Sequence, residues 1–246
     1  MAEFCIKIAG HVAAVKSQFD STKDYCRRYL TEATPEFSVV VKREDMALEQ
    51  QLAYEEALRE GFRPRVFTDP FLDRAVIQRK IAEHLLHRDV LLFHGSAVAV
   101  DGQGYLFAAK SGTGKSTHTR YWMETFGDRA VMVNDDKPFL RIEKDGTLLC
   151  GAPWSGKHGL DANVTVPLRG ICILERGEEN RICRMDVHTA LPQLLHEGCE
   201  PLDSSNMPQF ETLVGTLAQA APLWHMTCTR SPEAARIAHN AMSASV

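Results

Sequence analysis

The sequence predicts an α/β protein in which a mixed, partly antiparallel sheet is flanked by helices and carries a phosphate-binding loop (P-loop). Two observations support this fold class. A strand, a glycine-containing loop and a helix follow one another through residues 105–126. On both sides of that segment, pairs of apolar runs are joined by short glycine-containing turns, which is the pattern of β-hairpins. A small N-terminal α+β subdomain is expected ahead of these elements.

Three hairpins are predicted after residue 89. They cover residues 90–109 with a turn at 101–104, residues 139–150 with a turn at 144–146, and residues 170–185 with a turn at 176–179. In the commonest nucleotide hydrolases the loop lies in a parallel sheet of βαβ units. Hairpins on either side of the loop instead predict a sheet with a large antiparallel part.

The predicted domains are residues 1–70, the N-terminal α+β subdomain, and residues 71–246, the P-loop domain. Gly61, Pro64 and Pro70 interrupt the pattern between them and place the junction there. Spacing in the first domain predicts strands at 4–9 and 37–42 and helices at 12–30 and 45–59. In the second domain it predicts helices at 71–86, 189–195, 209–219 and 231–242, and a strand at 223–227.

Composition limits the classes of function. The 28 Lys and Arg against 32 Asp and Glu give a net charge of −4, which argues against a nucleic-acid partner. Seven cysteines without a C-x-x-C pair argue against a disulfide framework or zinc ribbon and favour a cytoplasmic location. The first residues carry too short an apolar run for a secretory signal. No apolar stretch approaches the ~18 residues of a membrane span, so no membrane partner is expected.

The phosphate loop is the strongest motif. Its glycines would let successive N–H groups point at one phosphate, and the start of the following helix adds positive potential. The lysine would contact the β- and γ-phosphates, and the serine after it would be a Mg²⁺ ligand. We therefore predict nucleotide binding. The motif comprises Ser111, Gly112, Thr113, Gly114, Lys115, Ser116 and Thr117, with Ala109 where the first glycine usually stands.

Asp135 and Asp136 follow the next apolar strand, at residues 131–133. Two acids at this place suit a magnesium ligand, assigned to Asp135 with Ser116, and a base that accepts the proton of an attacking hydroxyl. Adjacent carboxylates repel each other unless a cation lies between them. The alternative is that both only cap the end of the strand.

The glycine- and proline-containing segment 151–157 holds two candidate substrate residues, Trp154 and Lys157. The ring could stack on a ligand and the ammonium could neutralise phosphate charge. The alternative is an ordinary surface turn with a half-buried tryptophan. Residues 158–167, poor in apolar side chains, could form a mobile lid. His118, in the first helical turn after the loop, is expected to be exposed.

These motifs together resemble the catalytic domain of HPr kinase/phosphorylase and its relatives in the phosphoenolpyruvate-carboxykinase-like superfamily. The resemblance covers about residues 70–242. It rests on His94-Gly95, the P-loop, Asp135-Asp136, and the Pro-Leu-Arg-Gly run at 167–170. It implies a phosphoryl donor in the loop, His94 beside the acidic pair, Asp136 or Asp135 as the base for a serine hydroxyl, and Arg169 on the phosphoryl group or nucleotide.

The chain departs from this family at three points. Thr117 stands where HPr kinases have an acid, Ala109 replaces a glycine, and residues before 70 differ from the family's N-terminal domain. We therefore expect a small HPr-kinase-related protein rather than HPr kinase itself. A full carboxykinase is disfavoured because the chain is short for that family's additional substrate domain.

The first expectation is a Mg²⁺-dependent kinase that transfers the γ-phosphate of ATP to a hydroxyl, with serine of a protein or peptide preferred. GTP or pyrophosphate stay open as donors. A small metabolite, such as a free amino acid, is the second acceptor class. A nucleotide-binding module without transfer is the alternative from a different class. Assembly into a homo-oligomer is left open.

Overall fold

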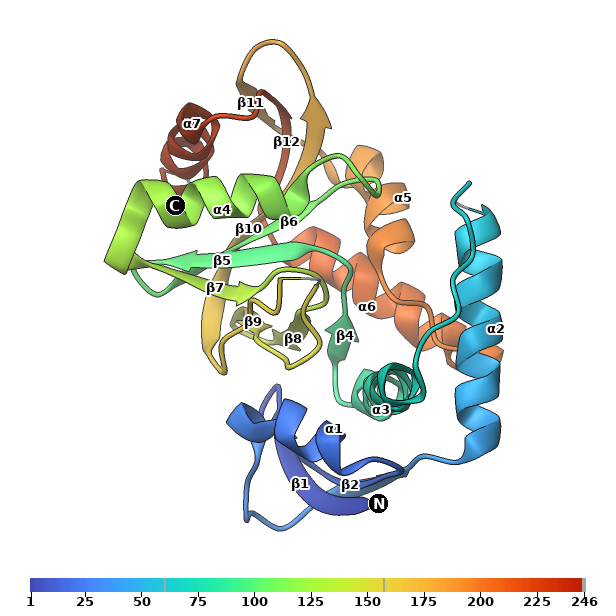
Figure 1. The fold of residues 1–246 in the computed structure, drawn as a ribbon. Helices are drawn as coiled ribbons and strands as arrows, with labels where there is room; N and C mark the ends of the chain where they lie inside the picture. Colours follow the sequence, from blue (N-terminus) through green and yellow to red (C-terminus); the bar gives the residue numbers. More distant parts are fainter. Residues whose placement is uncertain (60, 157, 245–246) are drawn as a thin grey trace. The chain divides into compact units, whose positions relative to one another are not determined.

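The computed structural model describes residues 1–59, 61–156 and 158–244. The chain divides into two compact units, Met1–Leu85 and Leu86–Val246 (Figure 1). The division lies later than the junction expected at residues 61–70. The helix predicted at 71–86, observed as α3 (Asp69–Leu86), therefore belongs almost entirely to the first unit.

A three-stranded sheet forms the first unit, with β1 (Ala2–Ile8) antiparallel to β2 (His11–Ser17) and β3 (Phe37–Val40) parallel to β2. The helix predicted over 12–30 is wrong in its first part. Ala9 and Gly10 both take positive φ, 50° and 91°, the geometry of a tight hairpin turn, so the chain returns along β1 as a strand. Helix begins only at α1 (Asp20–Tyr25), which is followed by the short turn η1 (Arg27–Tyr29).

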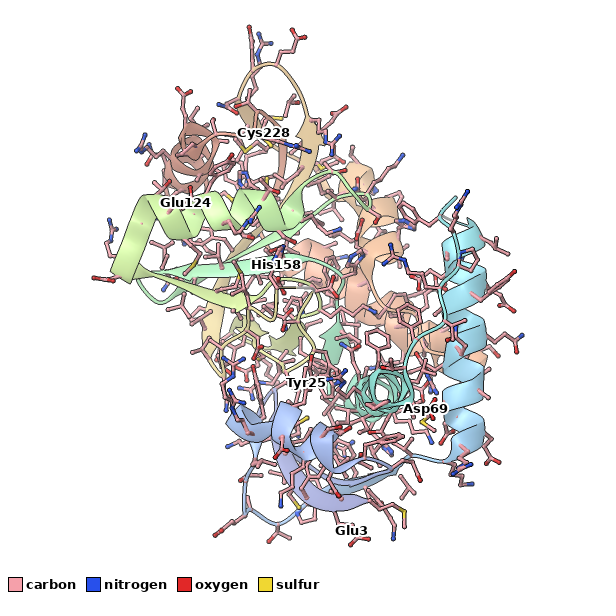
Figure 2. The ribbon with its side chains drawn as sticks, in the orientation of Figure 1. Glu3, Tyr25, Asp69, Glu124, His158 and Cys228 are labelled. Carbon is pink, nitrogen blue, oxygen red and sulfur yellow. The ribbon has the colours of Figure 1, made fainter. Side chains whose placement is uncertain are left out.

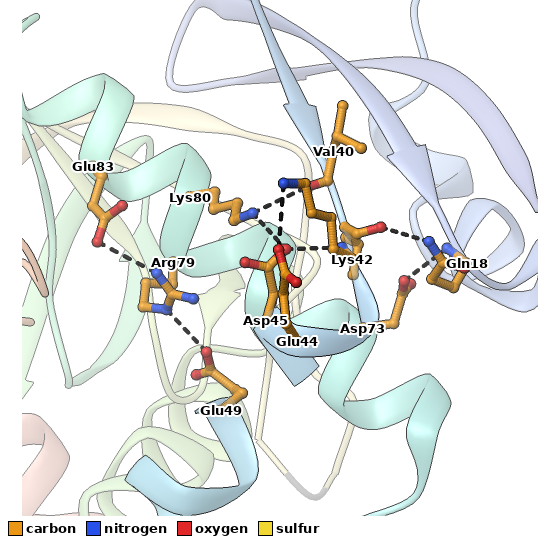
Figure 3. A network of polar contacts seen from close by, with 11 residues as sticks. Gln18, Val40, Lys42, Glu44, Asp45, Glu49, Asp73, Arg79, Lys80 and Glu83 are labelled. Atoms are coloured by element: carbon orange, nitrogen blue, oxygen red, sulfur yellow. Dashed lines mark hydrogen bonds and ion pairs between the residues drawn. The ribbon is translucent and has the colours of Figure 1, made fainter. Parts of the chain in front are cut away.

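Helices α2 (Arg43–Arg59) and α3 are joined by ion pairs (Figure 3). Arg79 Nε donates to Glu49 Oε2 at 2.9 Å, and Lys80 Nζ donates to Asp45 Oδ2 at 2.6 Å. Asp73, on α3, is fully buried. Its carboxylate accepts hydrogen bonds from the backbone of Gln18 and from two hydroxyls of the same unit, which ties α3 to the end of β2.

A mixed sheet runs through the second unit, in the order β4-β8-β9-β10-β6-β5-β7, with β12 beside β10 and β11 beside β12. β10 joins its two halves, because residues 165–167 pair antiparallel with β9 and residues 168–173 pair parallel with β6. The predicted mixed α/β character is confirmed. The strands are β4 (Val90–Leu92), β5 (Ser96–Val100), β6 (Gln103–Ala108), β7 (Ala130–Asn134), β8 (Phe139–Glu143), β9 (Gly146–Cys150), β10 (Thr165–Arg176), β11 (Arg181–Arg184) and β12 (Leu223–Cys228).

Two of the three predicted hairpins are confirmed. β5 pairs antiparallel with β6, and β8 with β9. The third is wrong, because β12 lies between β10 and β11, parallel to the first and antiparallel to the second. β12 carries large buried side chains, whereas β11 is short and mostly exposed, so the more apolar strand occupies the inner position and β11 forms the edge.

Helices cover both faces of this sheet (Figure 1). One core lies against α4 (Lys115–Phe126) and α7 (Pro232–Ser243), and the other against α5 (Val187–Glu197) and α6 (Met207–Ala220). Ser231 caps α7 by accepting the Ala234 N–H, as its position before Pro232 predicts. Short 3-10 turns η2 (Gly127–Arg129) and η3 (Ser204–Asn206) complete the elements. Among the described residues, no helix has the length and apolarity needed to cross a membrane.

Candidate functional site

Strand directions bring the predicted site residues to one edge of the large sheet. The P-loop follows the carboxyl end of β6. β5 is antiparallel to β6, so it begins at that edge, directly after His94 and Gly95. β7 is antiparallel to β5 and ends there, and Asp135 and Asp136 come next. Three segments that are well separated in the sequence therefore meet at a single place.

The P-loop turns through two glycines with positive φ, Gly112 at 78° and Gly114 at 117°, and α4 begins at the next residue. Only glycine adopts such angles without strain. The Lys115 side chain folds back over the loop, and its Nζ donates to the carbonyl of Ala109 at 2.7 Å. The alanine that replaces the usual glycine thus supplies a backbone acceptor for the loop lysine.

Asp135 lies next to Ser116, at the start of α4, and only 3% of the residue is exposed. The Gly156 N–H donates to its Oδ1 at 2.6 Å, and the Ser116 hydroxyl donates to its backbone carbonyl at 3.3 Å. Burial raises the pKa of Asp135 above its usual range; the Gly156 hydrogen bond opposes this, and the neighbouring Asp136 charge adds to it. The Ser116 hydroxyl contacts the backbone of Asp135 and not its carboxylate. A cation would stabilise the buried Asp135 carboxylate, and a serine hydroxyl and a carboxylate are both oxygen ligands, so the two residues fit Mg²⁺.

Within the described residues, no group of three or more His, Cys, Asp and Glu side chains is arranged to hold a metal ion. A magnesium ion at Ser116 and Asp135 would therefore complete its shell with water and phosphate oxygens. That is the usual arrangement for Mg²⁺ at nucleotide sites.

Asn134 organises the acidic pair, a role that no sequence motif indicated. It is fully buried, and its Oδ1 accepts the N–H groups of Asp136 and Lys137 at 2.9 and 2.7 Å. Its Nδ2 donates to the carbonyls of Ala152 and Trp154 at 2.8 and 3.2 Å. One side chain thus fixes both the turn after β7 and the segment after β9. An asparagine at the end of an apolar strand was the available signal.

His94 faces Asp136, as the sequence resemblance implies. Its Nε2 lies 3.7 Å from Asp136 Oδ1, and both side chains are partly exposed, at 34% and 40%. The Gly95 N–H donates to the Asp136 carbonyl at 2.8 Å. A Cβ on Gly95 would lie 2.9 Å from Leu106 Cδ1 and 3.0 Å from the Phe107 carbonyl, so the backbone reaches β6 only because this residue is glycine.

Glu197, the last residue of α5, is a second site residue that was not predicted. Only 2% of its side chain is exposed. Its Oε2 lies 3.2 Å from His94 Nδ1 and 4.0 Å from Lys115 Nζ. The signal was present in the sequence, because Ala190, Leu194 and Glu197 follow the spacing of one helix face and the first two are apolar. A glutamate on the buried face of a helix requires polar or charged side chains beside it to stabilise its carboxylate.

Arg169 is not brought to the loop, which corrects its predicted place on the phosphoryl group. It lies at the start of the parallel pairing with β6, at the opposite end from the P-loop, and donates to the Ser243 carbonyl at 2.8 Å. Arg176, at the other end of β10, contacts the loop instead. Its Nε donates to the Thr113 carbonyl at 3.0 Å, and its Nη2 donates to the Gly112 carbonyl.

The predicted substrate residues have different outcomes. Trp154 is 6% exposed and its ring packs edge-on against Phe139, so it is a core side chain rather than an open stacking surface. Lys157 lies outside the described residues. His158, labelled in Figure 2, begins the following segment, residues 158–167. Within it, the Ala162 N–H donates to the carbonyl of Val133, which holds this part of the chain to β7.

His118 is buried, not exposed as expected. Trp122 Nε1 donates to its Nε2 at 3.0 Å, and its ring packs edge-on against Phe107. Burial lowers the pKa of His118 from 6.5 to about 4, so the ring is neutral at physiological pH. This histidine belongs to the core beneath α4 and not to the site.

Comparisons with protein-family models and with curated proteins gave no match. Among solved structures, the HPr(Ser) kinase/phosphatase from Coxiella burnetii matches with a TM-score of 0.30 and 13% sequence identity. The match covers 52% of this chain and 93% of that chain. A likeness of this size assigns the chain to no family, so its function has to be inferred from the geometry of its own site.

Proposed function

We propose that the chain is a Mg²⁺-dependent kinase that binds ATP in the P-loop and transfers its γ-phosphoryl group to a hydroxyl, with serine of a protein or peptide as the preferred acceptor. One observation carries the proposal. The loop with Lys115, the buried Asp135 beside Ser116, and Asp136 facing His94 all meet at the same edge of the sheet. These are the parts that phosphoryl transfer requires.

Each group has a task in this reaction. The backbone N–H groups of the loop and the start of α4 would bind the phosphates. Lys115 would leave the Ala109 carbonyl and place its charge on the β- and γ-phosphates. Ser116 and Asp135 would hold Mg²⁺, which neutralises phosphate charge when bound. Asp136 would accept the hydroxyl proton as the acceptor oxygen bonds to phosphorus and the bond to the leaving ADP breaks.

Nucleotide binding is tested by calorimetry with Mg·ATP, Mg·GTP and Mg·pyrophosphate. Lys115→Met should weaken binding by about 10- to 100-fold, because a hydrogen bond to a charged group contributes about 1.5–3 kcal/mol. Lys110→Met is the matched control, since Lys110 lies in the same loop but is exposed. It should change affinity little. A wild-type chain that binds none of the three ligands would contradict the proposal.

Transfer is tested with γ-labelled ATP and separate pools of peptides and of small hydroxyl metabolites, for the wild type and Asp136→Asn. Label should pass to a peptide serine in the wild type, and the variant should bind nucleotide but lose transfer. Label on a metabolite would change the acceptor class and keep the kinase. Tight nucleotide binding without transfer to either pool would replace the kinase with a nucleotide-binding module.

A further inference from the structure

Glu197 occupies a place where a carboxylate costs stability. It ends α5, and the C-terminus of a helix carries partial negative charge that repels an anion. It is also buried, so its carboxylate has lost most of its hydration. Packing alone would favour an apolar side chain here, in line with Ala190 and Leu194 on the same face. The side chain is therefore better explained by what it contacts.

Its position relative to His94 is fixed by the backbone. The His94 N–H donates to the Glu197 carbonyl at 2.8 Å, and the Cys199 N–H donates to the Leu92 carbonyl at 3.0 Å. The end of α5 thus runs along the segment between β4 and β5. The 3.2 Å contact between the Glu197 carboxylate and His94 Nδ1 follows from this pairing rather than from two freely rotating side chains.

We propose that Glu197 is a positioning residue for His94. Its carboxylate accepts the Nδ1 proton, so the neutral imidazole has no proton on Nε2, the nitrogen that faces Asp136. The hydrogen bond at one ring nitrogen sets which nitrogen carries the proton. Lys115 Nζ, 4.0 Å from the same carboxylate, offsets part of the cost of burying it.

This assignment rests on the proposed function and adds a proton path to it. A protonated Nε2, which lies 3.7 Å from Asp136 Oδ1, would attract the Asp136 carboxylate and compete with the incoming hydroxyl for it. An unprotonated Nε2 leaves the Asp136 carboxylate available to take the hydroxyl proton while the new bond to phosphorus forms. The proton can then pass from Asp136 to Nε2, giving an imidazolium between two carboxylates. The proton then leaves the partly exposed His94 ring for water.

The test is long-range ¹H–¹⁵N NMR on ¹⁵N-histidine-labelled protein, at a pH well above the usual imidazole pKa of ~6.5. His94→Gln identifies the His94 signals. The wild type should show the Nδ1–H form. Glu197→Leu should lose that pattern, whereas Glu197→Gln, whose amide oxygen still accepts, should retain it. Glu200→Leu, an exposed site shortly after α5, is the control and should leave the His94 signals unchanged.

An Nε2–H form in the wild type would overturn the assignment whether or not the Leu variant folds. So would an unchanged pattern in a folded Glu197→Leu chain. Calorimetry with Mg·ADP on the same samples separates this result from the proposed function. Failure of the wild type to bind ADP would remove the nucleotide site, while the tautomer would still decide whether Glu197 controls His94.

Discussion

Asp73 in the first unit and Glu197 in the second are both buried carboxylates, yet their partners differ in kind. Asp73 accepts hydrogen bonds from the Ser17 and Thr22 hydroxyls, each at 2.6 Å, and from the Gln18 N–H at 2.9 Å. Glu197 is near an imidazole and an ammonium. Hydroxyl and backbone donors keep their protons across the physiological pH range. An imidazole can change protonation, and a lysine can move to a ligand. The first arrangement supports structure, and the second is suited to chemistry.

The largest effect should come from removing the Asp73 carboxylate. Asp73→Ala removes the acceptor of the Gln18 N–H and of the Thr22 hydroxyl, whereas the Ser17 hydroxyl keeps the Phe19 carbonyl as an acceptor. Each buried donor left without an acceptor costs about 1–3 kcal/mol. We expect the free energy of opening of β2 and α3 to fall by about 4 kcal/mol, measured by amide hydrogen exchange of Met1–Leu85.

Asp24→Ala is the control, because Asp24 is exposed on α1 of the same unit. Its exchange should match the wild type. A loss below about 1 kcal/mol for Asp73→Ala would break the comparison, since Asp73 would then be no more structural than a surface acid. Glu197→Gln, measured in the second unit, should lose less than Asp73→Ala, because the amide keeps one acceptor.

His118 sharpens the comparison, as a buried titratable group of the second unit that serves structure. Its pKa in the folded state is about 4, below the unfolded value of 6.5. The folded state therefore binds fewer protons than the unfolded state. The contribution of neutral His118 to the free energy of unfolding is complete above pH 6.5. The free energy of unfolding falls by about 3 kcal/mol in all as the pH drops from 6.5 to 4.

Tryptophan fluorescence during urea unfolding, without metal or nucleotide, measures this loss. All three tryptophans, Trp122, Trp154 and Trp224, lie in the second unit. His118→Gln keeps an acceptor for Trp122 Nε1 and should remove this part of the pH dependence. If the free energy of unfolding falls equally steeply between pH 6.5 and 4 in the variant and in the wild type, His118 is not the group responsible.

Local sequence signals predicted the elements well and their pairing less well. The hairpin of β5 and β6 depends on a four-residue turn, so the sequence contains it. The position of β12 between β10 and β11 depends on β12 being more apolar than β11. β12 follows β10 by about 50 residues, so no local pattern in the sequence records this pairing. Strand β2 was taken for the start of a helix for the same reason, because β1 supplies the pairing that makes it a strand.

The site shows the same division between local and distant information. Lys115, Ser116 and Asp135 were predicted to lie together because a loop motif and a strand end mark them, and the structure brings them to the same edge of the sheet. Glu197 was not, since it lies 82 positions beyond Lys115, although its apolar helix face marked it as buried. Arg169 was misplaced because a motif gives no direction: β10 needs about 3.3 Å per residue, so the seven steps to Arg176 span about 23 Å.

The smallest predicted effect separates the two arginines of β10. Arg176→Met removes donors to the Gly112 and Thr113 carbonyls and should loosen the P-loop. Because Arg176 is exposed, we expect a loss of about 1 kcal/mol, or roughly 5-fold in Mg·ATP affinity by calorimetry. Arg169→Met makes the same chemical change at the far end of the strand and should leave the affinity unchanged. A larger effect from Arg169→Met than from Arg176→Met would contradict this assignment and return Arg169 to the nucleotide site. Because the two substitutions make the same change in charge and length, a difference in Mg·ATP affinity between them reports which arginine contacts the P-loop.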